Sequence, residues 1–172
     1  MGTAVAVQPR PRVEFALRPG ARARYRIAFV CVGNSCRSQM AEAWVRHLAQ
    51  SEPGAEAVEA VSAGLYPLGF ITPETIQVMA EKEVSLEGQE SKGLEAIDWQ
   101  QVDVLVNMTP LPGGSVVPGF QGRRLHWNVP DPYLQPLRQY RRVRDQLERK
   151  VKHLLGELKK SSAGGPAAPP SA

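Results

Sequence analysis

The chain has few cysteines, few aromatic residues and no long apolar run. Only two cysteines occur among its 172 residues, which excludes a disulfide-rich scaffold and favours a reducing compartment such as the cytoplasm. No segment approaches the roughly 18 apolar residues of a membrane span. No basic stretch is interleaved with aromatic residues, so nothing indicates nucleic-acid binding. No His, Cys or carboxylate spacing is typical of a catalytic metal site, so we predict neither a metal nor a cofactor.

Composition predicts one folded domain between two low-complexity ends. Hydrophobic residues make up 42% of the chain, and the net charge of +4 suits anionic substrates. Residues 1–23 are rich in Pro, Ala and Arg, with Glu14 as their only acid, and we expect a disordered extension there. Residues 24–160 form the predicted domain. Residues 161–172, SSAGGPAAPPSA, cannot build a core and are a predicted disordered tail.

Strand and helix patterns alternate along the predicted domain. Apolar runs predict strands, helical spacing predicts helices, and Thr72-Pro73-Glu74 opens a helix with an N-cap and a proline at its first position. This alternation predicts an α/β fold, a single-domain three-layer sandwich with a four-stranded parallel sheet flanked by helices. The expected strands are 25–31, 57–61, 102–106 and 124–127, and the other two expected helices are 38–50 and 137–158.

The segment from Cys31 to Ser38 carries the main chemical signal. It follows an apolar strand, precedes a helix and has the composition of a loop that binds a tetrahedral oxyanion through backbone N–H groups. Cys31 is the candidate nucleophile, because N–H donors, a helix N-terminus and a guanidinium favour its thiolate. Arg37 holds two anion oxygens, and the Ser38 hydroxyl binds the thiolate. The substrate-binding candidates are the loop residues Val32, Gly33, Asn34, Ser35, Cys36 and Arg37; Gly33 and Asn34 allow its unusual backbone conformation.

The two cysteines also have interpretations without a catalytic role. Most single cysteines are inert core thiols, and a short Cys-x5-Arg pattern occurs by chance. The position of Cys31 between a strand and a helix favours the functional interpretation. For Cys36 two interpretations stay open, a small residue that fills the loop or the partner of Cys31 in a reversible disulfide.

The segment VCVGNSCRSQMAE, residues 30–42, resembles the phosphate-binding loop of the low-molecular-weight protein tyrosine phosphatase superfamily. It is most similar to the thioredoxin-coupled arsenate reductase branch, and the resemblance extends over about residues 24–160. It implies that Cys31 is the nucleophile and Arg37 the anion clamp. It also implies that Asp131, in an Asp-Pro pair otherwise typical of a plain turn, is the general acid and base. Tyr133 matches an aromatic residue that lines the aryl-phosphate pocket of such phosphatases.

The chain departs from the reductase branch in two ways. Those reductases use a relay of three cysteines, whereas Thr109 stands at the second relay position here and no third cysteine follows. They also hold a potassium ion behind the loop. Asn34, Glu42 and Ser62 match its side-chain ligands, but Lys92 replaces an aspartate, and we expect the Lys92 ammonium to occupy the place of the cation.

These observations predict a cysteine-dependent phosphatase that hydrolyses phosphotyrosine-like phosphomonoesters through a phosphocysteine. One alternative is an arsenate reductase that uses Cys31 with an external thiol reductant. Another alternative is a non-catalytic module that binds oxyanions. The expected partners are a phosphate-ester or oxyanion substrate, with phosphotyrosine proteins among the candidates, and a thiol reductant if the chain is a reductase.

Overall fold

The computed structural model of this protein describes residues 25–51 and 58–163. The predicted extension 1–23 and most of the predicted tail 161–172 lie outside the described residues. The main elements follow in the order β1 Tyr25–Cys31, α1 Arg37–Ser51, β2 Val58–Gly64, α2 Pro73–Ala80, β3 Val104–Asn107, β4 Arg123–His126 and α3 Leu137–Ala163. Three short 3₁₀ helices, η2 Leu94–Ala96, η3 Trp99–Gln101 and η4 Gly113–Ser115, lie around β3 in the sequence.

The four strands form one parallel sheet in the order β2-β1-β3-β4. The predicted α/β fold with a four-stranded parallel sheet is therefore confirmed. From Ile27 to Cys31, β1 is a buried run of β-branched, aromatic and small apolar residues. From β1 the chain passes through α1 to β2 on one side, and it later adds β3 on the other side of β1. The direction of the strand order therefore reverses at β1. Ligands of parallel sheets bind beyond the carboxyl end of such a strand, and Cys31 lies there.

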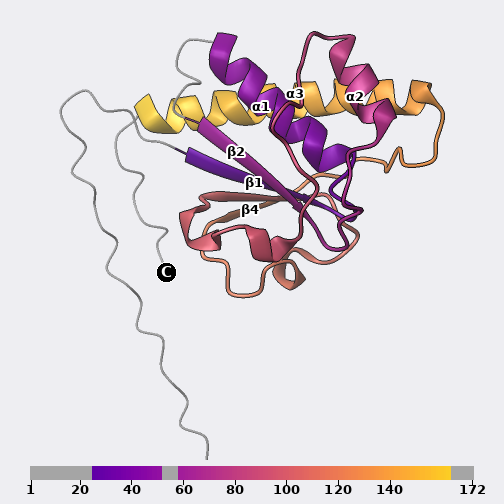
Figure 1. The fold of residues 1–172 in the computed structure, drawn as a ribbon. Helices are drawn as coiled ribbons and strands as arrows, with labels where there is room; N and C mark the ends of the chain where they lie inside the picture. Colours follow the sequence, from indigo (N-terminus) through magenta and orange to yellow (C-terminus); the bar gives the residue numbers. More distant parts are fainter. Residues whose placement is uncertain (1–24, 52–57, 164–172) are drawn as a thin grey trace, which may run out of the picture.

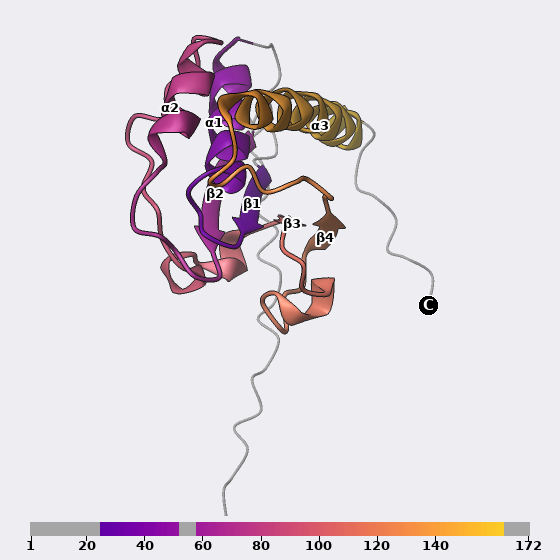
Figure 2. The same cartoon turned by 90° about the vertical axis from the view of Figure 1, so that its right-hand side faces the viewer.

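The two faces of the sheet are covered by different kinds of structure (Figures 1 and 2). All three α-helices lie on one face, where the largest hydrophobic cluster joins α1 and α3 to the strands. The 3₁₀ helices and their connecting segments cover the other face, where Leu94, Trp99 and Phe120 pack against Ala28 and Val30 of β1. The predicted three layers are present, and short 3₁₀ helices make up the third.

Several boundaries differ from the predicted ones by a few residues. β1 has the predicted bounds, whereas β2 runs to Gly64 and α3 continues to Ala163. α3 has one apolar side, with Leu147 and Val151 fully buried, so its length follows from packing along the whole helical layer. No helix in the described ranges combines the length and apolar character needed to cross a membrane.

Candidate active site

The loop between β1 and α1, residues 32–36, is held in shape by the side chain of Asn34. Asn34 has a φ of 44°, in the left-handed region. Its Nδ2 donates to the hydroxyl oxygens of Ser38 at 2.7 Å and Ser62 at 2.9 Å, and its Oδ1 accepts from the Lys92 backbone N–H at 2.8 Å. The unusual backbone conformation thus falls on Asn34. Gly33 was expected to share it, but its φ is not positive, and a Cβ there would instead lie 3.2 Å from Leu68 Cγ.

The carbonyl groups of this loop point outward into hydrogen bonds with neighbouring segments. Three of them accept backbone N–H groups from the segment after β2, in the pairs Val32 with Tyr66, Gly33 with Leu68 and Ser35 with Thr72. The Cys31 carbonyl, at the end of β1, likewise accepts the Leu65 N–H. The backbone N–H groups of residues 32–37 make no hydrogen bond within the described chain. Since the C=O and N–H of a peptide plane point in opposite directions, these N–H groups are free to converge on an anion.

Cys31 and Ser38 meet at the base of the loop. The Cys31 Sγ lies 2.9 Å from the Ser38 Oγ, and both residues are buried. The Ser38 oxygen already accepts a hydrogen bond from Asn34, so its own proton is available to the sulfur. A thiolate at Cys31 therefore has a hydroxyl donor at contact distance.

Backbone carbonyl groups hold the Arg37 guanidinium in place but bind only its Nη1. Its Nη1 donates to the carbonyl oxygens of Met108 at 2.8 Å and Val129 at 3.1 Å. The side chain is 7% exposed, and its Nε is buried without a hydrogen-bond partner in the described chain. A buried, unpaired guanidinium N–H is costly unless a ligand accepts it, and a tetrahedral oxyanion has the oxygens to do so.

Asp131 faces Arg37 from the segment after β4. Its Oδ2 lies 3.4 Å from the Arg37 Nη2, while its Oδ1 accepts the Tyr133 backbone N–H at 3.1 Å. The carboxylate is half exposed, so water and a substrate can reach it. The Asp-Pro pair is therefore a turn, as its composition indicates, and this turn also brings a carboxylate to the loop. Leu134, which follows Tyr133, has a φ of 62° and is 82% exposed.

The second cysteine points into the α-helical layer. Cys36 Sγ lies 3.5 Å from Thr72 Oγ1 and 3.9 Å from Tyr140 OH. Burial raises the pKa of this thiol, which keeps it protonated. Both cysteines are free thiols, and the surroundings of Cys36 fit a small buried residue that fills the loop. Thr109, at the position of the second relay cysteine, closes a local turn through its hydroxyl bond to Asn107 Oδ1 at 2.7 Å.

The placement of the Lys92 ammonium in the position of the cation stays a prediction. The ammonium forms no ion pair with Glu42 among the described residues, but burial, which raises the Glu42 pKa, is opposed in part by the nearby Lys92 charge. Glu42 is almost fully buried behind the loop, where it accepts the Ser62 hydroxyl at 2.5 Å and the Arg46 guanidinium at 2.7 Å. The Lys92 ammonium instead donates to the Glu90 carbonyl oxygen at 3.4 Å. Arg46 binds Glu42 because it lies one helical turn away on α1. Its guanidinium therefore reaches the carboxylate within the helix itself.

Two glutamines that the sequence interpretation missed support the loop from behind. Gln39 donates through its Nε2 to the Asn34 Oδ1 at 2.9 Å and to the Glu90 carbonyl oxygen at 2.9 Å. Gln89 in turn donates to the Gln39 Oε1 at 2.8 Å. The only sequence signal for Gln39 is a polar residue within the buried beginning of α1, and no local pattern marks Gln89.

Comparison with known proteins agrees with this geometry. Residues 26–163 match the family of low molecular weight phosphotyrosine protein phosphatases, and the chain belongs to that family. Among curated relatives, the glutaredoxin arsenate reductase of Synechocystis sp. is 30% identical over 135 residues, which cover 77% of this chain and 98% of the relative. Arsenate reductase 2 of Bacillus cereus is 32% identical over 128 residues, which cover 73% and 90%.

Solved structures with the same fold include both kinds of enzyme. An arsenate reductase in its phosphate-binding state superposes with a TM-score of 0.67 at 29% identity, over 77% of this chain and 98% of that one. The YwlE arginine phosphatase, solved with a phosphorylated active-site serine, superposes with a TM-score of 0.71 at 28% identity, over 80% and 98%. The family thus includes phosphatases and arsenate reductases of similar overall structure.

Proposed function

We propose that this protein hydrolyses aryl phosphomonoesters, such as phosphotyrosine, through a phosphocysteine intermediate. The Cys31 thiolate attacks phosphorus while the P–O bond to the leaving group breaks, and Asp131 transfers its proton to the departing oxygen. Asp131 then accepts a proton from water as that water displaces the sulfur and releases inorganic phosphate. Arg37 and the loop N–H groups bind the equatorial oxygens in both steps, and Ser38 stabilises the thiolate that leaves.

The observation that carries this proposal is the position of the Asp131 carboxylate, 3.4 Å from the Arg37 guanidinium that would hold the substrate. A module that only binds oxyanions gains nothing from a carboxylate beside its anion clamp, because like charges repel. A phosphatase needs such a group to protonate the leaving oxygen. The acid must also be accessible to water for the second step, and Asp131 is half exposed.

The preference for an aryl group is supported by the apolar side chains around the loop. The segment after β2, which is bonded to the loop carbonyls, exposes Tyr66, Leu68 and Phe70, with exposed fractions of 76%, 40% and 50%. Tyr133 and Leu134, next to Asp131, are also exposed. Exposed apolar residues concentrated in two segments that contact one anion site favour a ligand with a large apolar or aromatic body.

A second candidate is arsenate reduction, which the names of the curated relatives favour. Reduction of arsenate to arsenite takes two electrons, so a second thiol must attack the Cys31 adduct and form a disulfide as arsenite leaves. Cys36 is a poor second thiol because its raised pKa keeps it protonated, and Thr109 has no sulfur. The second thiol would therefore come from glutathione or a glutaredoxin, in a reducing compartment such as the cytoplasm.

Parallel assays of one preparation test the proposal. We expect hydrolysis of phosphotyrosine without any electron donor, and no arsenate turnover with thioredoxin and thioredoxin reductase alone. Cys31→Ser should abolish hydrolysis while inorganic phosphate still binds in calorimetry, because the loop N–H groups and Arg37 remain. Phosphoarginine serves as the competing phosphate substrate, since a relative of similar fold is an arginine phosphatase.

The outcomes separate the candidates. Faster hydrolysis of phosphoarginine than of phosphotyrosine would contradict the aryl preference while keeping the phosphocysteine route. Arsenate turnover only with glutathione or glutaredoxin, with no phosphatase activity, would replace the proposal by the reductase. Phosphate binding without either activity would leave an oxyanion-binding module.

A further inference from the structure

The hydrogen-bond ladder between β1 and β3 stops at Met108. Its backbone N–H donates to the Val30 carbonyl oxygen at 2.8 Å, as the pairing of Val30 with Asn107 requires. In a regular parallel ladder the next bond would join the Val32 N–H to the Met108 carbonyl. That bond is absent from the described chain, and the Arg37 Nη1 donates to the Met108 carbonyl instead, at 2.8 Å. One carbonyl group therefore affects both the position of Arg37 and the freedom of the Val32 N–H.

The chain leaves this ladder through a turn that two buried side chains hold. Asn107 and Thr109 are each 2% exposed. The Asn107 Oδ1 accepts the Thr109 backbone N–H at 2.8 Å and the Thr109 hydroxyl at 2.7 Å, while its Nδ2 donates to the Leu111 carbonyl oxygen at 2.9 Å. The Thr109 Oγ1 in turn accepts the Leu111 N–H at 3.2 Å. Such an Asx turn gives the backbone an alternative to the ladder of a sheet.

The orientation of the Asn107 amide follows from these partners. Exchanging its N and O would place an NH₂ group against the Thr109 backbone N–H, which can only donate, and an oxygen against the Leu111 carbonyl, which can only accept. The Thr109 hydroxyl bridges the two ends of the turn, because it donates to Asn107 and accepts from Leu111. An apolar side chain at position 109 would break both bonds of this bridge.

The turn determines where the free edge of the Arg37 guanidinium points. Its Nη1 is held by two carbonyls, that of Met108 and that of Val129 at 3.1 Å. A guanidinium is planar, so fixing Nη1 also fixes the directions of Nε and Nη2. The Nε has no partner in the described chain, and the Nη2 lies 3.4 Å from Asp131 Oδ2. The turn thus acts on atoms that would bind the oxyanion, although its own side-chain bonds lie within residues 107–111.

We propose that Asn107 and Thr109 are positioning residues for oxyanion binding. Their turn ends the ladder so that Arg37 receives the Met108 carbonyl and the anion receives the Val32 N–H. The inference rests on Arg37 as the anion clamp of the proposed function, and it is independent of the reaction of the bound oxyanion. Without the turn, the Val32 N–H pairs with the Met108 carbonyl, and the anion loses a loop N–H and a well-placed guanidinium together.

A titration of the full-length protein with inorganic phosphate, followed by NMR of the Arg37 Nε–H and the backbone amides, tests the proposal. The loss of one signal in Arg37→Lys assigns the Nε–H. In the wild type we expect saturable shifts of the Arg37 Nε–H and the Val32 N–H. Thr109→Val removes the bridging hydroxyl at nearly equal size. It should raise the dissociation constant of phosphate by about five- to tenfold, a share of the loss of about tenfold or more that follows when a charged group loses a hydrogen bond.

Hydrogen exchange gives a signature that a purely structural role would not produce. Without phosphate, the Val32 N–H of Thr109→Val should exchange more slowly than that of the wild type, because it then pairs with the Met108 carbonyl. A general loss of stability would instead speed the exchange of this N–H. If Thr109→Val does not fold, Thr109→Ala takes its place, since it removes the hydroxyl without placing a methyl group against Asn107 Oδ1.

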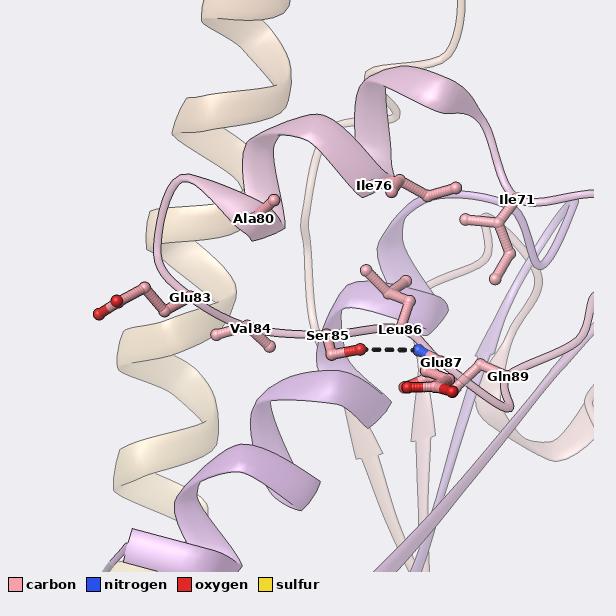
Figure 3. A pocket seen from close by; sticks show the side chains of 9 residues that line it. All are labelled: Ile71, Ile76, Ala80, Glu83, Val84, Ser85, Leu86, Glu87 and Gln89. Carbon is pink, nitrogen blue, oxygen red and sulfur yellow. Dashed lines mark hydrogen bonds between the residues drawn. The ribbon is translucent and has the colours of Figure 1, made fainter.

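A conservative variant and a remote one serve as controls. Thr109→Ser keeps the hydroxyl and should bind phosphate as tightly as the wild type. Ser85→Ala is the matched control, because the Ser85 hydroxyl also closes a turn. It accepts the Glu87 backbone N–H at 3.0 Å in the segment after α2, as the dashed line in Figure 3 shows. Its loss should leave phosphate affinity unchanged.

Unaltered phosphate affinity in the variant without the Thr109 hydroxyl would overturn the proposal, as would an equal loss of affinity in Thr109→Ser. Absence of saturable shifts in the wild type, or exchange of the Val32 N–H that is not slowed in the variant, would do the same. Phosphate affinity that depends on the Thr109 hydroxyl supports the proposal even if the protein does not hydrolyse phosphotyrosine. The two failures are therefore distinguishable.

Discussion

At the scale of single residues, Asp131 has two roles that one substitution separates. Its Oδ1 closes the turn to Tyr133, and its Oδ2 faces Arg37. Asp131→Asn keeps an oxygen for the turn but removes the transferable proton. We expect hydrolysis of esters with poor leaving groups to slow by about a hundredfold or more, and phosphocysteine formation from activated aryl phosphates to slow much less. Pre-steady-state kinetics with a series of phenols measures both.

Asp98→Asn is the matched control for this prediction. Asp98 is an exposed aspartate that caps η3 through the Gln100 backbone N–H, so the same change there should leave turnover unaltered. An equal rate loss for every leaving group in Asp131→Asn would mean that Asp131 only shapes the turn.

The sequence predicted best the residues whose role follows from the chemistry of their own side chain and backbone. Asn34 tolerates a left-handed backbone, and the structure has it there. Glu42 shows the limit, because the sequence did not predict that Arg46, its neighbour on the same helix, binds its carboxylate. Gln89 was not predicted at all, since its contact with Gln39 joins positions 50 residues apart and has no local pattern.

At the scale of elements, the loop of residues 32–36, the anion loop, packs against the end of β2. Gly64 pairs with Cys31, and a Cβ on Gly64 would lie 2.8 Å from both the Asn34 backbone nitrogen and the Val32 carbonyl oxygen. Backbone atoms cannot yield as a flexible side chain does. Gly64→Ala should therefore displace the loop, destabilise the protein by about 1–3 kcal/mol and reduce turnover and phosphate affinity together.

Gly156→Ala is the matched control at this scale. Gly156 lies within α3, and a Cβ there would meet nothing within 4 Å. Alanine should stabilise the helix by about 0.5–1 kcal/mol without changing turnover. Denaturant unfolding and phosphatase assays of both variants check the pair, and a fully active Gly64→Ala protein would show that β2 does not fix the loop.

Elements with a regular apolar pattern were predicted from the sequence, and irregular ones were not. β1 has the predicted bounds and is apolar without a break from Ile27 to Cys31, and Thr72 caps α2 as its sequence indicates. The 3₁₀ helices that cover the second face are only three residues long, too short for a hydrophobic period. The segment after β2 was also missed, because its bonds to the loop carbonyls exist only once the sheet has formed.

At the scale of the whole molecule, two carboxylates give opposite contributions to the dependence of stability on pH. Burial raises the pKa of Glu42 above 4.5, against the opposing effects of the Ser62 hydrogen bond and the nearby charges of Arg46 and Lys92. Glu81, at the end of α2, is bound by Arg141 and Arg144 of α3, and hydrogen bonding from Arg141 is the main reason that its pKa falls to about 2. One group lies behind the anion loop, and the other joins two helices.

The direction of each effect follows from which state binds the proton more tightly. The folded protein holds the Glu42 proton more tightly than the unfolded chain, so the stability from this group is present below about pH 4.5 and is lost as the pH rises through the raised pKa. The folded protein holds the Glu81 proton less tightly, so its contribution is present above about pH 4.5 and is lost as the pH falls toward 2.

Two amide substitutions therefore change the pH profile of unfolding in opposite directions. Relative to the wild type, Glu42→Gln should become more stable as the pH is raised from about 4.5 to neutral, because it has no carboxyl to ionise in the buried site. Glu81→Gln should be less stable than the wild type at neutral pH, and this difference should shrink as the pH is lowered from about 4.5 toward 2. The free energy of unfolding in urea, measured across this range for all three proteins, gives both slopes. Parallel profiles for Glu42→Gln and the wild type would mean that Arg46 and Ser62 compensate the burial of Glu42 in full.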